Sequence, residues 1–154
     1  MGKVESLQNP LRLPWLICII LFIGLIASIF ACHYFADSIR MPIDESDRIF
    51  VRTALYALAI ILFPLTNLMR HILLRLNQTM PGEKSASERY WWTILITQSM
   101  IESIGLFGPL MVVLGDDFNT LYIFSLMSAL GIYLHRPKWQ DYASIVDALS
   151  SVQH

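Results

Sequence analysis

A single acidic residue, Glu102, lies inside a long apolar stretch of this 154-residue chain and is the first candidate for chemistry. It stands 11 residues after Trp91 and 12 before Leu114, so a helix through this stretch would carry it near its middle. If the stretch crosses a bilayer, a charged side chain at that depth costs about 2.5–3.5 kcal/mol on insertion scales. We therefore expect Glu102 either to handle a proton or ion, or to form a structural hydrogen bond between helices as a neutral acid.

Polar and small residues accompany Glu102 on the same predicted helix. Gln98 lies one turn earlier on the same face, Ser99 and Ser103 are adjacent, and Gly105 continues the stripe. This polar face is expected to point at other helices rather than at lipid, because lipid offers no hydrogen-bond partners. Glu102, Gln98, Ser99 and Ser103 are therefore the predicted ion- or proton-binding candidates.

The segment Met100–Gly108, MIESIGLFG, resembles the carboxylate-bearing helix of the c (proteolipid) subunits of rotary ATPases. That helix has a glutamate followed closely by small and apolar residues, with a glycine six positions on, as in this segment. In the family the carboxylate binds a proton or sodium ion as the ring rotates, and a cytoplasmic polar loop precedes the helix. The resemblance, which is confined to the residues around Glu102, implies that Glu102 is the ion-binding carboxylate and Gln98 a candidate co-ligand.

Four apolar runs must supply the helices that position these residues. They are Trp15–Ala36, Thr53–Met69, Tyr90–Leu114 and Phe118–Leu134, of 22, 17, 25 and 17 residues. About 20 apolar residues cross the ~30 Å hydrocarbon core as a helix, so the first and third runs suffice by themselves. The two short runs can extend into their polar flanks, because Arg52, Arg70 and Arg136 could snorkel to the interface.

The sequence thus predicts an all-α membrane protein with four transmembrane helices, spanning about residues 15–36, 53–71, 90–114 and 118–135. Two alternatives remain: the short runs could be core helices of a soluble bundle, and the first run could be a cleaved signal peptide. The first run is longer than the roughly 7–15 apolar residues of a typical signal core, which favours a retained helix.

Composition and motifs exclude several classes of function. Charged residues make up 15% of the chain, against roughly 25% in soluble domains, and the net charge is −1, so no nucleic-acid partner is expected. Cys18 and Cys32-His33 lack the further ligands that a metal or haem site needs. Without a nucleophile–base set or a phosphate-binding loop, the sequence predicts no enzyme, no metal and no cofactor.

Turn and capping signals separate the runs. Connections are predicted over residues 37–52 and 77–89, with a tight turn over 115–117. Ser85 with Glu88 three residues later fits a capping box that opens the third helix. Asp116 and Asp117 suit a turn and the positive N-terminal end of the fourth helix.

A short amphipathic tail is predicted over residues 137–154. Its apolar face would carry Trp139, Tyr142, Val146 and Leu149, and it would lie on the membrane surface or on a protein partner. The alternative is a frayed polar terminus.

Charge distribution predicts the orientation. Eight Lys and Arg residues fall on the side of the two termini and three, Arg40, Arg48 and Arg52, on the other side, which favours cytoplasmic termini. Interfacial aromatic residues are expected on the same side, namely Trp15, Tyr90, Trp91, Trp92, Tyr133 and Trp139. A bacterial inner membrane suits this compact, oriented chain.

Small residues on the third and fourth helices permit close helix packing. The predicted packing positions are Gly105, Ser125, Ser128, Ala129 and Gly131. The leading hypothesis is a non-enzymatic accessory or interaction subunit of a membrane assembly, with the bilayer and a second copy or other membrane proteins as partners. The alternative is a proton- or cation-handling transport or channel protein that uses Glu102.

Overall fold

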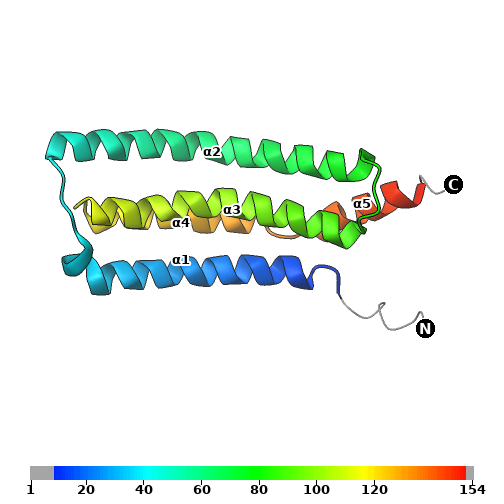
Figure 1. Ribbon diagram of the computed structural model, residues 1–154, viewed down its shortest axis with the longest axis horizontal. Coiled ribbons are helices and arrows are strands. Elements are labelled where there is room, and N and C mark those ends of the chain that lie inside the picture. The colour runs from blue at the N-terminus through cyan, green and yellow to red at the C-terminus, as the bar shows by residue number, and fades with distance from the viewer. Residues whose placement is uncertain (1–8, 152–154) are drawn as a thin grey trace.

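The computed structural model describes residues 9–151, which form five α-helices joined by short connections (Figure 1). The helices are α1 (Arg12–Ile39), α2 (Glu45–Thr79), α3 (Ala86–Val113), α4 (Phe118–Leu134) and α5 (Trp139–Ser151). The predicted all-α class is confirmed.

The helix α3 is the centre of the bundle. It contacts each of the other four helices, and its most extensive packing is against α4, the next helix along the chain. Figure 1 shows α1 and α2 as separate rows on opposite sides of the α3–α4 pair. The two outer helices therefore bury one narrow face each and expose apolar side chains on the rest, such as Phe30 (70% exposed) and Ile60 (66% exposed).

The connections gather at two opposite ends of the bundle (Figure 1). The start of α1, the end of α2 and the whole of α5 lie at one end, which we name the terminal end. At the other, the loop end, the α1–α2 connection meets the α3–α4 turn. There the backbone N–H of Met41 donates to the Val113 carbonyl at 2.7 Å, and that of Ile43 to the Leu114 carbonyl at 3.4 Å.

Three of the helices have the length and composition of membrane spans. The helices α1, α2 and α3, with 28, 35 and 28 residues, are long and apolar enough to cross a bilayer. The helix α4 has 17 residues and is a shorter apolar helix. The described residues thus form a helical bundle that is compatible with embedding in a membrane.

The helix α2 is longer than its apolar run. At 1.5 Å per residue its 35 residues extend about 52 Å, well beyond a ~30 Å hydrocarbon core. The connection predicted over residues 37–52 is wrong for most of its length, because α1 continues to Ile39 and α2 already begins at Glu45. The acidic residues Glu45 and Asp47 lie in the first turn of α2, where they interact favourably with the positive end of the helix dipole.

Two predicted helix caps are confirmed. The Ser85 side chain accepts a hydrogen bond from the Glu88 backbone N–H at 3.2 Å and opens α3. The Asp117 carboxylate accepts from the Thr120 N–H at 3.2 Å and opens α4. Each bond satisfies one of the backbone donors that the first turn of a helix leaves free.

The predicted small residues bring α3 close to its neighbours. A Cβ atom at Gly105 would lie 2.8 Å from the Leu25 Cδ1 of α1 and 2.9 Å from the Ser128 Oγ of α4. A Cβ atom at Gly131 would lie 2.5 Å from the Ile101 Cγ2 of α3. Ser125 and Ser128 are buried, while Ala129 is half-buried. Gly105 and Gly131 therefore allow helices of the same chain to approach closely.

The C-terminal helix α5 packs against α2 and α3 through part of its predicted face, since Tyr142 and Leu149 pack against the core. Ile145 is its fully buried residue, whereas Trp139 is 59% exposed and Val146 38% exposed. The predicted face is wrong for these two residues because polar contacts set the rotation of the helix. The Gln78 Nε2 of α2 donates to the Ser144 Oγ at 3.0 Å, and Asp141 pairs with an arginine of α2.

Candidate functional site

Glu102 lies in the middle of α3, on the side where α4 packs. Its carboxylate is half-buried and accepts a hydrogen bond from the Ser128 Oγ of α4 at 3.4 Å, a long distance for an O–H donor. No Lys, Arg or His within residues 9–151 forms an ion pair with this carboxylate. Glu102 thus makes one weak contact between helices.

The other predicted candidates do not gather around Glu102. Ser99 is exposed on α3, and the half-buried Ser103 donates to the Met100 carbonyl of its own helix at 2.6 Å. Gln98 is fully buried, but its Nε2 donates to the Ile132 and His135 carbonyls at the end of α4, at 3.3 and 3.0 Å. The structure therefore pairs Glu102 with Ser128 and places Gln98 in a separate polar cluster.

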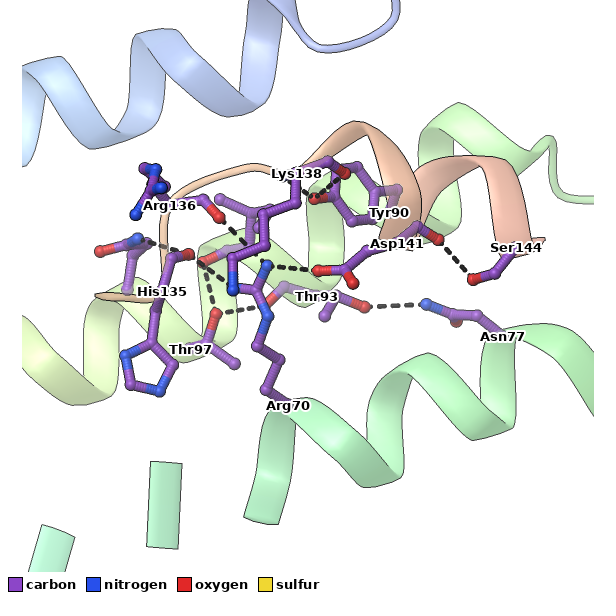
Figure 2. Close-up of polar contacts among 12 residues, drawn as sticks. Arg70, Asn77, Tyr90, Thr93, Thr97, His135, Arg136, Lys138, Asp141 and Ser144 are labelled. Atoms are coloured by element: carbon purple, nitrogen blue, oxygen red, sulfur yellow. Dashed lines mark hydrogen bonds and ion pairs between the residues drawn. The ribbon is translucent and has the colours of Figure 1, made fainter. Parts of the chain in front are cut away.

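That cluster lies at the terminal end, where α4 stops, and we name it the Arg70 network: Arg70, Gln98, His135 and Asp141. Arg70 comes from α2 and is buried. Its guanidinium donates to the carbonyls of His135 and Arg136, the latter at 3.1 Å, and to the Asp141 carboxylate at 2.7 Å (Figure 2). The expectation that Arg70 snorkels to the interface is wrong, because these acceptors hold it inside the protein.

The Arg70 network closes the C-terminal end of α4. The last carbonyls of a helix have no partner within it, and this end carries partial negative charge. The Arg70 cation and the Gln98 amide both donate to the His135 carbonyl, while the His135 Nδ1 donates to the Gly131 carbonyl at 3.0 Å. Residues from α2, α3 and α5 are in this way joined to one helix end.

Tyr90 adds a second link between α3 and the segment before α5. Its side chain is fully buried, its hydroxyl donates to the Lys138 carbonyl at 3.1 Å, and it accepts from the Lys138 backbone N–H at 2.8 Å (Figure 2). The prediction that Tyr90 anchors the protein at the lipid headgroups is therefore wrong. Trp15, Trp92, Tyr133 and Trp139 are exposed, as residues at an interface would be.

A hollow of about 380 Å³ opens beside the Arg70 network, between α2 and the end of α4. We name it the Arg70 pocket. Its walls are Phe63, Pro64, Asn67, Arg70, Leu134, His135 and Lys138. Cationic and amide groups thus share one cavity with apolar side chains.

A second ionic cluster lies at the loop end and was missed by sequence reasoning. Asp116 is buried, its carboxylate lies 2.9 Å from Arg52 and 3.9 Å from Arg48, and it accepts from the Thr120 Oγ1 at 2.8 Å. Arg40 donates to the Asp116 carbonyl at 3.5 Å. Because these arginines come from both sides of the α1–α2 connection, Asp116 holds that connection to the α3–α4 turn.

An apolar furrow runs between α1 and α4 on the face away from α2. It consists of two hollows of about 430 and 260 Å³, which share Phe22 and Ala129. Residues of α1 from Trp15 to Ile29 and residues of α4 line it, and Ser125 lies in its wall. The Ser125 Oγ is buried and has no hydrogen-bond partner among the described residues.

Metal ligands do not cluster in the described part of the chain. Within residues 9–151, no group of three or more His, Cys, Asp or Glu side chains could hold a metal ion. Cys18 and Cys32 are buried free thiols on α1.

Comparison of the chain with protein-family models, with curated proteins and with solved structures found no match.

Proposed function

We propose that the chain is a multi-pass membrane protein in which α1 to α4 all cross the bilayer and both termini are cytoplasmic. The start of α1 and the helix α5 lie at the same end of the bundle, which supports an even number of crossings (Figure 1). At 1.5 Å per residue, α4 covers about 25 Å, slightly less than a ~30 Å core. The eight Lys and Arg residues on the side of the termini support their cytoplasmic placement, in a bacterial inner membrane.

Within that membrane, we propose that the protein is a non-enzymatic accessory subunit that binds a transmembrane helix of another membrane protein. The furrow between α1 and α4 is the proposed contact. From Trp15 to Ile29 it follows 15 residues of α1, whose first and last Cα atoms lie about 21 Å apart along the helix axis, which is most of the hydrocarbon thickness. Its apolar walls and the small Ala129 permit the close approach of a further helix.

The unpartnered hydroxyl of Ser125 is the observation that carries this proposal. A buried hydroxyl without a hydrogen bond is costly, and an acyl chain has no group that could satisfy it. The Oγ atom itself is covered, so the Ser125 side chain must rotate toward the furrow before a polar side chain or a carbonyl group of a neighbouring helix can supply the missing partner, as in many membrane helix interfaces. A protein helix therefore fits the furrow better than lipid does.

Photo-cross-linking in the native membrane tests the accessory role. A photoreactive residue at Ile23, in the furrow, is expected to give one adduct of discrete mass with another membrane protein, whereas the same residue at the exposed Ile61 of α2 gives none. Filling the furrow by Ala129→Phe should remove most of the adduct. Equal labelling at both positions, or adducts only with lipid or with a second copy of this chain, would contradict the proposal.

A second candidate function is proton or cation handling through Glu102. The half-buried carboxylate with one long hydrogen bond supports it, because a group of this kind retains the capacity to bind a proton or cation. The resemblance of Met100–Gly108 to the rotary ATPase c subunits points in the same direction.

Flux measurements in liposomes separate the two candidates. If the protein handles ions, Glu102→Gln is expected to reduce proton or sodium flux to the level of empty liposomes, because the amide retains the hydrogen bond from Ser128 but cannot bind a proton. Glu83→Gln, in the exposed connection before α3, is the matched control and should leave the flux unchanged. The accessory role alone predicts no flux above that of empty liposomes in any of the three proteins.

A further inference from the structure

The Arg70 pocket is placed where a lipid could enter it. It lies on the seam between α2 and α4, two helices that both pack on α3. Phe63 and Pro64 line it from the part of α2 nearer the bilayer centre, and Arg70 lines it from the part nearer the terminal end. The cavity therefore changes from apolar to cationic along the membrane normal, as an amphiphile does.

The cationic part of the pocket retains free hydrogen-bond donors. A guanidinium has five N–H groups, and the bonds of Arg70 to His135, Arg136 and Asp141 use three of them. Lys138 is exposed at the mouth of the cavity, and its ammonium forms no ion pair among the described residues. The amide of Asn67 also has no partner among them.

The charges around the cavity sum to a positive value. Asp141 neutralises Arg70 at 2.7 Å, so Lys138 supplies the net positive charge at the mouth. Burial lowers the pKa of His135 and so favours its neutral form, and because Nδ1 donates to the Gly131 carbonyl, Nε2 is left as an acceptor for a hydroxyl group. A phosphate that carries a hydroxylated substituent matches this arrangement of donors and acceptor.

We propose that the Arg70 pocket binds the phosphate-containing headgroup of an anionic phospholipid whose acyl chains lie along the α2–α4 seam. Basic pockets between transmembrane helices near the membrane surface commonly hold such headgroups. The apolar walls formed by Phe63, Pro64 and Leu134 favour a membrane lipid over a free phosphate ion, which would leave them unoccupied. This site is separate from the α1–α4 furrow and does not depend on the accessory role.

Native mass spectrometry of the full chain in detergent tests the site. Phosphatidylglycerol and phosphatidylcholine with identical acyl chains are titrated separately, and inorganic phosphate forms a third arm. We expect one phosphatidylglycerol molecule to be retained per chain, with weak retention of phosphatidylcholine and no competition from phosphate at equal concentration.

Two variants identify the pocket residues. Lys138→Ala should weaken phosphatidylglycerol binding about fivefold, the factor expected when one lysine near an anionic lipid is lost. Lys84→Ala, an exposed lysine at the same end of the bundle, is the control and should bind as the unaltered chain does. Asn67→Leu should also weaken binding without any change of charge.

Three results would overturn the proposal. Equal affinity for the two lipids would show that the headgroup charge is not recognised. Equal losses in Lys138→Ala and Lys84→Ala would show nonspecific attraction to a basic surface. Full competition by inorganic phosphate would assign the pocket to a free anion instead of a lipid.

Discussion

Replacement of Arg70 by methionine is expected to lower the free energy of unfolding by about 3 kcal/mol, the lower end of the range for breaking a buried ion pair. The lower end applies because the Asp141 side chain is 23% exposed and water can hydrate it once its partner is removed. The same change removes the donors to the His135 and Arg136 carbonyls, so the end of α4 loses its cap. Thermal and denaturant unfolding in detergent measure the loss.

A matched control separates this effect from the loss of any positive charge. Arg75 is exposed on the same helix, five residues further on, and Arg75→Met should change stability by no more than about 0.5 kcal/mol. In the Arg70→Met background, Asp141→Asn should recover part of the loss, because it removes the unpaired carboxylate. Equal losses in the two arginine variants would show that the Arg70 network contributes little.

The second large effect is expected at Gly108, where α3 meets the backbone of α4. A Cβ atom there would lie 2.9 Å from the Leu121 Cδ1 and 3.1 Å from the Leu121 Cα and carbonyl oxygen. Backbone atoms cannot move aside as a flexible side chain can, so Gly108→Ala must separate the two helices. We expect a loss of about 1–3 kcal/mol, as for other overpacked cores, measured by unfolding in detergent.

Gly24 on α1 provides the opposite case. A Cβ atom at this position would meet nothing within 4 Å, so Gly24→Ala adds a side chain without a clash. The substitution should stabilise the helix by about 0.5–1 kcal/mol, because alanine loses less conformational freedom than glycine does on folding. If Gly108→Ala raised stability as Gly24→Ala does, the close approach of α3 and α4 at Gly108 would be contradicted.

The predictions for Arg70→Met and Gly108→Ala both concern how the short helix α4 is held in the bundle. Its first turn is fixed by the Asp117 cap, by Asp116 and by the contact of Leu121 with Gly108, and its end is fixed by the Arg70 network. Both the α1–α4 furrow and the Arg70 pocket include residues of α4. We therefore expect that loosening α4 would weaken partner binding and lipid binding together.

Much of the helical architecture could be predicted from local sequence. Apolar runs indicate helices of membrane length, and the caps at Ser85 and Asp117 involve residues only three positions apart. The ends of α2 could not be located from the apolar run, because a helix can continue through polar residues once it has left the hydrocarbon core. The face of α5 was predicted correctly at Tyr142 and Leu149 but not at Trp139 and Val146, since Asp141 and Ser144 pair with residues of α2 that are far away in the sequence.

The candidate sites depend on contacts over long sequence separations. Arg70 and Asp141 are 71 positions apart, and Arg52 and Asp116 are 64 apart. One signal could have indicated the role of Arg70: it lies four residues after Thr66 and eleven after Ala59, on what proves to be the buried face of α2. No comparable signal places Gln98 at the end of α4 rather than beside Glu102.

The sequence by itself determined that the chain is helical and apolar. It also determined where the four apolar runs begin and end, and that Glu102 lies deep within one of them. These properties follow from composition and from spacing within single helices. Only the tertiary structure decided which polar side chains meet, because a buried charge is stabilised by whichever partner the packing brings within about 3 Å. In the folded chain Arg70 caps the end of α4 from inside the protein, and Glu102 makes one weak contact. Ser125 lies without a hydrogen-bond partner among the described residues in the wall of the furrow, and Lys138 lies at the mouth of the Arg70 pocket.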